Sequence, residues 1–237
     1  MARFPYGVGT AGWDTRVGME DLSRFLRPNR HVDSDHPQVV AFAHDVAGGL
    51  SPREAAVALH DVVRERLRYT AWRVSFSEDA YRASAVLQRS WDHGGHCIDK
   101  ALLLAASARA LGIPARMHYA NVRNHVGTVK LVEALGTDLM VFHGYTELHL
   151  GGRWVAATPA FNRSLCERLG VAPLEFDGVN DSIFQENDGP GGRFMEYVTD
   201  HGAFEGVPFA LMIRQWEEHY PHFARERRWG SAPEGSD

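Results

Sequence analysis

The first half of the chain has apolar residues at the spacing of amphipathic helices. The clearest helix is predicted to begin after Ser51, because Ser51 and Glu54 form a capping box and Pro52 takes the first helical position. Apolar residues then recur three or four positions apart, at Ala55, Leu59, Val62, Val63 and Leu67. We predict shorter helices over 19–26, 37–46 and 78–87.

A different pattern follows in SWDHGGHCIDKALLLAASARALGIPAR, which occupies residues 90–116. Between Cys97 and Ala110 there is neither proline nor glycine, and alanine and leucine dominate, so the stretch predicts a strong helix. Gly112 ends this helix and Pro114 prevents it from resuming. Apolar residues surround nearly the whole helix, which predicts that it is buried.

The second half changes to the alternating pattern of strands. We predict strands over 116–122, Leu139–Leu150 and Arg153–Ala157. Gly151 and Gly152 separate the last two strands, which indicates a two-residue hairpin loop. Helices followed by antiparallel strands predict an α+β fold.

Two more helices and a tail complete the predicted order. Ser164 and Glu167 fit a capping box, so a short helix is predicted over 164–169. A last helix is predicted over Phe209–His219. The final stretch, 229–237, is rich in glycine and polar residues, and we predict that it is disordered.

Composition narrows the class of protein. The 237 residues fit one domain, which we place over 1–228, and the 44% of apolar residues suffice for a hydrophobic core. The net charge of -5 and the absence of a basic stripe argue against a nucleic-acid partner. No segment has the pattern of a signal peptide or the unbroken apolar length of a membrane span, so we expect no membrane association.

The two cysteines, Cys97 and Cys166, cannot form a disulfide framework. A reduced, cytoplasmic setting is therefore expected. Cys97 stands at the start of the predicted buried helix, after Gly94 and Gly95. A helix N-terminus carries partial positive charge, which stabilises a thiolate and predicts a lowered pKa for Cys97. Its backbone N–H groups can also bind an oxyanion. This position suits a nucleophile, and equally a small buried cysteine.

A nucleophilic cysteine needs a base, and the strand LMVFHGYTELHL supplies a candidate. Because side chains alternate along a strand, its polar residues share one face. These are His143, Tyr145, Glu147 and His149, whereas Phe142, Thr146, Leu148 and Leu150 share the other face. The polar face is either plain solvent exposure or the wall of an active site.

The hairpin register adds a neighbour for His143. If Gly151 and Gly152 form the loop, Thr158 falls opposite Tyr145 and one diagonal away from His143. Diagonal neighbours lie about 7–8 Å apart at Cα. Thr158 is therefore a candidate to orient the imidazole ring.

Two of these stretches resemble a known family. GHCIDKALLLAASARALGIPAR resembles the cysteine-helix motif of the transglutaminase-like superfamily, and HGYTELHLGGRWVAATP resembles the strand pair that follows it. The resemblance covers residues 40–162. It implies a papain-like arrangement, in which the cysteine helix packs on an antiparallel sheet and a Cys-His-Asp triad forms. It assigns Cys97 as nucleophile and His143 as general base.

The resemblance breaks at the third member of the triad. Thr158 stands where the family usually has aspartate, and a hydroxyl can accept a hydrogen bond but cannot stabilise an imidazolium by charge. Asn162 is a second candidate or a supporting residue. Glu147 is a third, although it lies two strand steps from His143, or roughly 13 Å. Residues predicted to line the acyl or oxyanion site are Trp91, His96 and Tyr145.

Several functions remain open at this point. The first is amide or acyl chemistry through a thioacyl-enzyme, as a peptidase or amidase or as a transglutaminase-type transferase, on a peptide, protein or small-molecule substrate. The second is a binding module that has lost catalysis. The third is a specialised acyl-transfer or cyclisation enzyme of small-molecule metabolism. We expect no cofactor and no metal, because His143 and His149 lie about 20 Å apart on an extended strand and cannot share a zinc ion.

Overall fold

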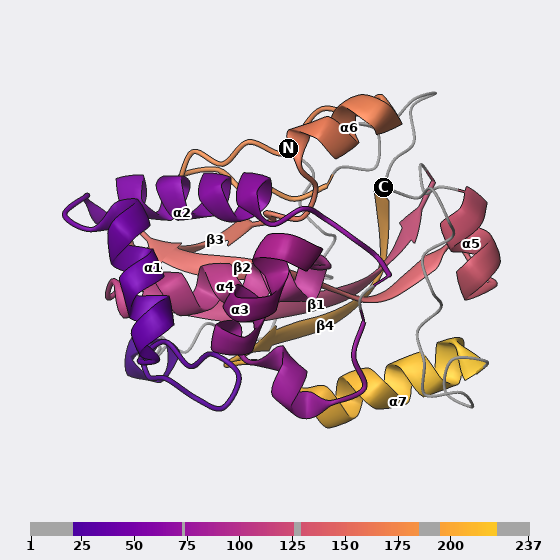
Figure 1. Cartoon of the computed structure of the whole chain (residues 1–237), viewed down its shortest axis with the longest axis horizontal. Helices are drawn as coiled ribbons and strands as arrows, with labels where there is room; N and C mark the ends of the chain where they lie inside the picture. Colours follow the sequence, from indigo (N-terminus) through magenta and orange to yellow (C-terminus); the bar gives the residue numbers. More distant parts are fainter. Residues whose placement is uncertain (1–20, 73, 126–128, 185–194, 222–237) are drawn as a thin grey trace, which may run out of the picture.

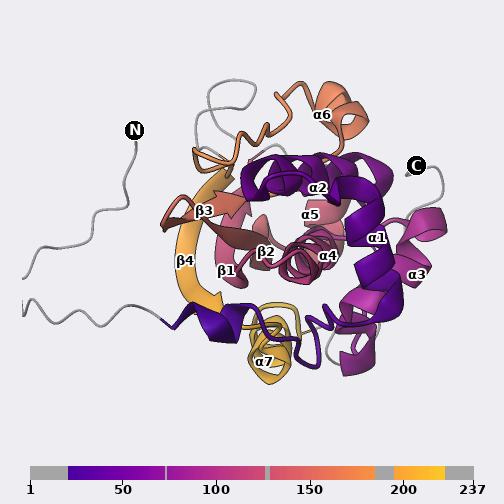
Figure 2. The ribbon, with the colours of Figure 1, turned by 90° about the vertical axis from the view of Figure 1, so that its left-hand side faces the viewer.

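The cysteine-bearing helix lies at the centre of the protein. In the computed structural model, which describes residues 21–72, 74–125, 129–184 and 195–221, α4 (Cys97–Ala110) lies between a sheet and a group of helices (Figures 1 and 2). Every residue from Ile98 to Arg109 is buried. The predicted bounds and burial of this helix are confirmed.

Three helices cover the side of α4 that faces away from the sheet, namely α1 (Pro37–Ala47), α2 (Pro52–Arg66) and α3 (Ala83–His93) (Figure 2). The capping box of α2 is confirmed: the Glu54 N–H donates to Ser51 Oγ at 3.5 Å, and Glu54 Oε2 accepts from the Ser51 N–H at 3.1 Å.

The helix predicted over 78–87 is wrong in its bounds. The structure has a 3-10 turn at Glu78–Tyr81, an extended Arg82, and then α3. The Tyr81 hydroxyl donates to the Ser75 carbonyl at 3.0 Å, which fixes the turn. The helix predicted over 19–26 is a 3-10 helix at Leu22–Phe25, and its first residues lie outside the described ranges.

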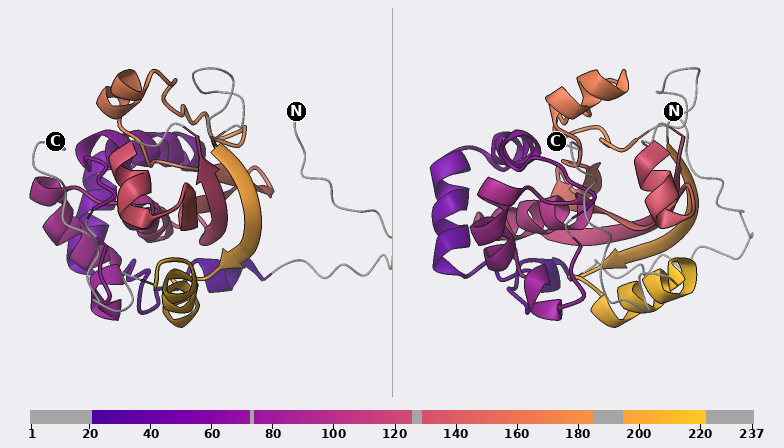
Figure 3. Two further views of the ribbon diagram at one scale, coloured as in Figure 1. Left: turned by 90° about the vertical axis from the view of Figure 1, so that its right-hand side faces the viewer. Right: turned by 45° about the vertical axis from the view of Figure 1, so that its right-hand side comes forward.

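An antiparallel sheet packs on the other side of α4. Its strands are β1 (Ala115–Asn124), β2 (Leu139–Leu150), β3 (Arg153–Ala157) and β4 (Met195–Phe204), in the order β3-β2-β1-β4. β4 was not predicted, and it curves along the edge of the sheet (Figure 3). Its pairing with β1 is irregular at two points, and such irregularities bend a strand.

The hairpin between β2 and β3 has the predicted register. Gly151 and Gly152 have φ values of 58° and 83°, as a tight turn with two positive-φ residues requires. Leu150 pairs with Arg153, and His149 pairs with Trp154. The face assignment made from the sequence therefore rests on a confirmed register.

Three helices lie around this core, α5 (Val129–Leu135), α6 (Arg163–Leu169) and α7 (Phe209–His219). The capping box predicted for α6 is wrong, because the helix begins one residue earlier and Asn162, not Ser164, is its N-cap. The predicted tail, 229–237, lies outside the described residues. Within the described part of the chain, no helix combines the length and apolar character that crossing a membrane requires.

Two hydrophobic clusters meet at Cys97. The larger one lies between α4, its covering helices and the inner face of the sheet, where the Thr146 hydroxyl also donates to the Ala101 carbonyl at 2.7 Å. The smaller one packs Ala120 of β1 against Phe161 and Phe184. Cys97 contacts both clusters, so its side chain sits at the seam between them.

Candidate active site

A buried polar cap shapes the start of α4. His96 is the N-cap: its Nδ1 accepts from the Ile98 N–H at 3.2 Å, and its own N–H donates to Asp99 Oδ2 at 3.2 Å. Arg89 holds Asp99 by an ion pair of 2.5 Å. Burial lowers the pKa of His96, in keeping with a neutral ring that accepts at Nδ1. His96, predicted to line the site, serves as a helix cap next to Cys97.

The loop before Cys97 is pinned to the end of α2. The Gly95 N–H donates to the Arg68 carbonyl at 2.9 Å, and the Thr70 N–H donates to the Gly95 carbonyl at 3.1 Å. Gly94 has φ of 72°, and a Cβ there would lie 2.3 Å from the Arg68 oxygen. Only glycine fits this close backbone approach, which fixes where the helix begins.

The sulfur of Cys97 lies against β2. The backbone N–H groups of Gly144, Ile98 and Cys97 itself favour the thiolate, yet burial outweighs them and raises the pKa of Cys97 to about 11. The lowered pKa expected from the helix N-terminus is therefore wrong for this state of the protein. The thiol is protonated at neutral pH, and the contact with Gly144 brings it beside the residue next to His143.

A bulge in β2 sets the direction of His143. Between the pairs Ala120–His143 and Val122–Met140, β2 has two residues where β1 has one. One of the two, Phe142, has a positive φ of 65°, and its N–H donates to Asn121 Oδ1 at 2.9 Å. Bulges and strained residues re-aim side chains next to functional sites.

His143 is a buried, neutral base. The residue is 6% exposed, and burial lowers the pKa of its ring to about 4. Among the described residues its Nε2 has no hydrogen-bond partner. The Phe184 ring lies 5.9 Å from the imidazole, centroid to centroid, and keeps this side of the ring dry.

Thr158 has the same unusual state. It is 1% exposed, and its Oγ1 has no hydrogen-bond partner among the described residues. Ala157 pairs with Thr146 at the end of β3, and Thr158 is the next residue along the chain. Leaving a buried polar group unpaired costs about 1–3 kcal/mol. Thr158 Oγ1 and His143 Nε2 are thus two buried polar atoms to which the described residues supply no hydrogen bond.

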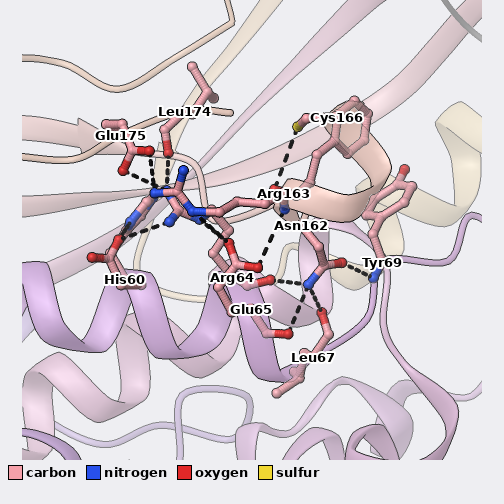
Figure 4. Close-up of polar contacts among 12 residues, drawn as sticks. His60, Arg64, Glu65, Leu67, Tyr69, Asn162, Arg163, Cys166, Leu174 and Glu175 are labelled. Atoms are coloured by element: carbon pink, nitrogen blue, oxygen red, sulfur yellow. Dashed lines mark hydrogen bonds and ion pairs between the residues drawn. The ribbon is translucent and has the colours of Figure 1, made fainter. Parts of the chain in front are cut away.

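The other residues predicted to belong to the site make contacts elsewhere. Asn162 Oδ1 accepts from the Tyr69 N–H at 2.6 Å, and its amide N–H groups donate to carbonyls at the end of α2 (Figure 4). Glu147 pairs with Arg116 at 2.5 Å, and Tyr145 stacks on His118 at 4.7 Å. These described contacts do not include His143. Trp91 belongs to α3, and its side chain lies outside the described part.

Sequence reasoning missed an aromatic wall beside the site. Tyr69 meets Phe161 at 4.7 Å, and Phe161 meets Phe184 at 5.0 Å, centroid to centroid. Tyr69 and Tyr197 both lie close enough to Cys97 for the thiolate to raise the pKa of their hydroxyls, after the larger effect of burial. Phe161, Phe184 and Tyr197 come from a loop and an unpredicted strand, and no periodic pattern marks them.

The arrangement of a cysteine helix on an antiparallel sheet has a counterpart among known proteins. The sequence profile of the Transglutaminase-like superfamily matches residues 40–159, which is just over half of the chain. The chain belongs to the transglutaminase-like superfamily. The resemblance read from the cysteine helix and the histidine strand is thus confirmed, as is the α+β fold with its papain-like core.

One solved structure shares the fold, and a second is a more distant match. A candidate cysteine protease from Cytophaga hutchinsonii is 19% identical with a TM-score of 0.51, over 81% of this chain and 50% of that chain. The periplasmic domain of TgpA from Pseudomonas aeruginosa, bound to ethylmercury, is 19% identical with a TM-score of 0.43, over 62% and 51% of the two chains. This chain thus spans about half the length of the Cytophaga protein. No curated protein matches it.

Proposed function

We propose that the protein is a cysteine enzyme that forms a thioacyl intermediate on Cys97, with His143 as the general base. The observation that carries this proposal is the buried His143 imidazole, whose Nε2 has no hydrogen-bond partner in the described part of the chain. It adjoins Gly144, and the Gly144 N–H is directed at the Cys97 sulfur. Membership of the transglutaminase-like superfamily and the candidate cysteine protease with the same fold support it.

The charge state of the site defines the first step. Both groups are neutral at pH 7, because the pKa of Cys97 is about 11 and that of His143 is about 4. The His143 imidazole accepts the thiol proton as Sγ attacks the substrate carbonyl carbon. The Cys97 backbone N–H, at the start of α4, stabilises the resulting oxyanion.

The second half of the reaction returns the proton. The C–N or C–O bond to the leaving group breaks, the imidazolium gives that group its proton, and a thioester remains on Cys97. Water or an amine then attacks the thioester, with His143 again taking the proton, and the thiol is released. Thr158 Oγ1 is the acceptor that we assign to orient the His143 ring. We propose hydrolysis of amides or related acyl groups as the first activity and transfer to an amine as the second.

A specific observation also favours a binding module of the same fold. No carboxylate among the described residues adjusts the pKa of His143, which burial alone lowers. Without that charge an imidazolium is poorly stabilised, and an aspartate-dependent triad would lose orders of magnitude in rate.

Mass spectrometry of the acylated protein separates the two functions. We expect p-nitrophenyl acetate to leave one acetyl group on Cys97, and none on the buried Cys166, with release accelerated by methylamine if transfer occurs. Cys97→Ser is the matched control for the nucleophile. Acetylation that is absent, or equal at both cysteines, would leave only the binding module.

A further inference from the structure

Asn162 makes an unusual set of bonds at the C-terminal end of α2. Its Nδ2 donates to the carbonyls of Arg64, Glu65 and Leu67, the last two at 3.1 and 3.2 Å, and its Oδ1 accepts from the Tyr69 N–H at 2.6 Å (Figure 4). The side chain is 4% exposed. Both ends of one amide are thus saturated by the backbone of a single short segment.

The helix that carries Cys97 reaches the same carbonyls. Lys100, one turn after Cys97, donates from Nζ to the carbonyls of Arg64 at 2.8 Å and Leu67 at 2.7 Å. A lysine that donates N–H groups at a helix C-terminus is favourable, because the last carbonyls of the helix have no partner within it. Two oxygens of α2 therefore join α4 to the loop that holds Asn162.

The local sequence would direct Asn162 elsewhere. It is the N-cap of α6, a position where asparagine normally accepts from an N–H of its own helix. Here the side chain makes no such bond. Asn162 does not cap α6 with its side chain but bonds the segment that ends α2. The stability of α6 therefore does not explain this side-chain position.

The chain path supplies that reason. Asn162 holds the Tyr69 N–H, the adjacent Arg68 and Thr70 pair with Gly95, and Gly95 precedes Cys97 by two residues. Phe161 reinforces the hold by its ring contact with Tyr69. On its other side Asn162 follows Thr158 by four residues. One amide thus lies between the segment that positions the nucleophile and the segment that bears Thr158.

We propose that Asn162 is a positioning residue, which holds the loop before Cys97 in place relative to the segment of Thr158. This inference rests on the proposed function, since it concerns the geometry of the same site. It assigns Asn162 no contact with substrate. Loss of the amide would free the Gly94–Cys97 loop, so that the sulfur moves away from Gly144 and becomes more exposed.

The test compares Asn162→Ala and Asn162→Gln with the matched control Asn29→Ala. Asn29 also bonds only backbone groups, accepting from His31 and Val32 and donating to Glu205. Each protein is assayed well below its melting temperature, so that all are folded. Two rates are measured: acetylation of Cys97 by p-nitrophenyl acetate, and alkylation of Cys97 by iodoacetamide near neutral pH.

The two rates are expected to move in opposite directions. In Asn162→Ala, acetylation should fall at least about tenfold through lost alignment. Alkylation should rise, by up to about 100-fold if the thiol pKa returned from about 11 to about 9. Asn162→Gln keeps both hydrogen-bonding groups on a longer arm, so it should fold if the alanine variant does not, and should show the same opposite shifts. Asn29→Ala should change both rates by less than about twofold.

A merely structural role would leave both rates of the folded variants at wild-type values, and that result would overturn the proposal. If wild-type protein is not acetylated at Cys97, the proposed function fails on its own. The alkylation rate still decides the role of Asn162 in that case. A rise in the Asn162 variants but not in Asn29→Ala supports it, and unchanged alkylation contradicts it.

Discussion

His118 and His143 lie on the same face of the sheet, but their surroundings shift the two pKa values in opposite directions. His118 Nε2 contacts Asp200 at 2.6 Å and its Nδ1 contacts Glu147 at 3.3 Å. Burial works against the charged ring, but the two carboxylates outweigh it and raise the pKa of His118. His143 is buried, the described residues offer its Nε2 neither a carboxylate nor another partner, and burial lowers its pKa to about 4.

The difference separates a structural histidine from one that can do chemistry. His118, on β1, is a structural residue, because its two carboxylate partners come from β2 and β4 and so link three strands. Its Nε2 is hydrogen-bonded to Asp200, and its Nδ1 lies within ion-pair distance of Glu147. His143 is neutral and unsatisfied, so it can take a proton and accept an orienting contact. The two residues are of the same type and lie on the same face of the sheet. The partners of each histidine decide its role.

The largest expected effect is a loss of acylation that follows one histidine and not the other. His143→Ala should reduce the rate of Cys97 acetylation at least about a thousandfold, because the thiol loses the base that accepts its proton. His118→Ala should leave this rate within about threefold and instead lower the free energy of unfolding by about 1–3 kcal/mol. The measurements are the burst of p-nitrophenolate and urea unfolding. Equal losses of acylation would mean that the two roles are not separate.

A smaller effect concerns how stability depends on pH. The unfolded His143 has a pKa of about 6.5, and the folded one about 4. As pH falls from 6.5 to 4, His143 therefore binds a proton in the unfolded chain but stays neutral in the folded protein. The free energy of unfolding should drop by about 3 kcal/mol over this window from His143 alone.

His118 should contribute with the opposite sign. Its raised pKa means that its stabilising effect is fully present below pH 6.5 and is lost as pH rises through the folded pKa. Urea unfolding of wild type, His143→Gln and His118→Gln at stepped pH tests both signs. The His143 variant should flatten the acid side of the profile, and the His118 variant the neutral side. An unchanged acid slope in His143→Gln would contradict the neutral, buried ring.

Local signals explain what the sequence could predict of the fold. The buried helix starting at Cys97 and the hairpin with Gly151 and Gly152 have caps, breakers and turn residues that depend only on neighbours in the chain. β4 could not be found in this way, because MEYVTDHGAF alternates poorly and two irregularities interrupt its pairing. Its curvature and its place at the edge are set by β1.

The site divides in the same manner. The hairpin register from Leu150–Arg153 to Thr146–Ala157 was predicted correctly, since it follows from the turn alone, and the position of Thr158 diagonal to His143 stays a prediction. The bulge at Phe142 depends on Asn121, a residue of another strand. The pKa of Cys97 was predicted in the wrong direction, because the helix N-terminus is visible in the sequence and the burial that outweighs it is not. Both features depend on contacts between residues far apart in the sequence, and local patterns carry no information about such contacts.

The smallest effect would make His143 more like His118. Thr158→Asp sets a carboxylate on the face of His143, and this should raise the pKa of the imidazole above about 4 and stabilise the imidazolium formed during attack. Acetylation of Cys97 should rise about tenfold, and NMR titration of the ring should report the pKa. Thr158→Asn, which has the same shape without the charge, should leave the pKa low. If Thr158→Asp changes neither the pKa nor the rate, Thr158 does not face His143, and the imidazole must be oriented by the bulge at Phe142 alone.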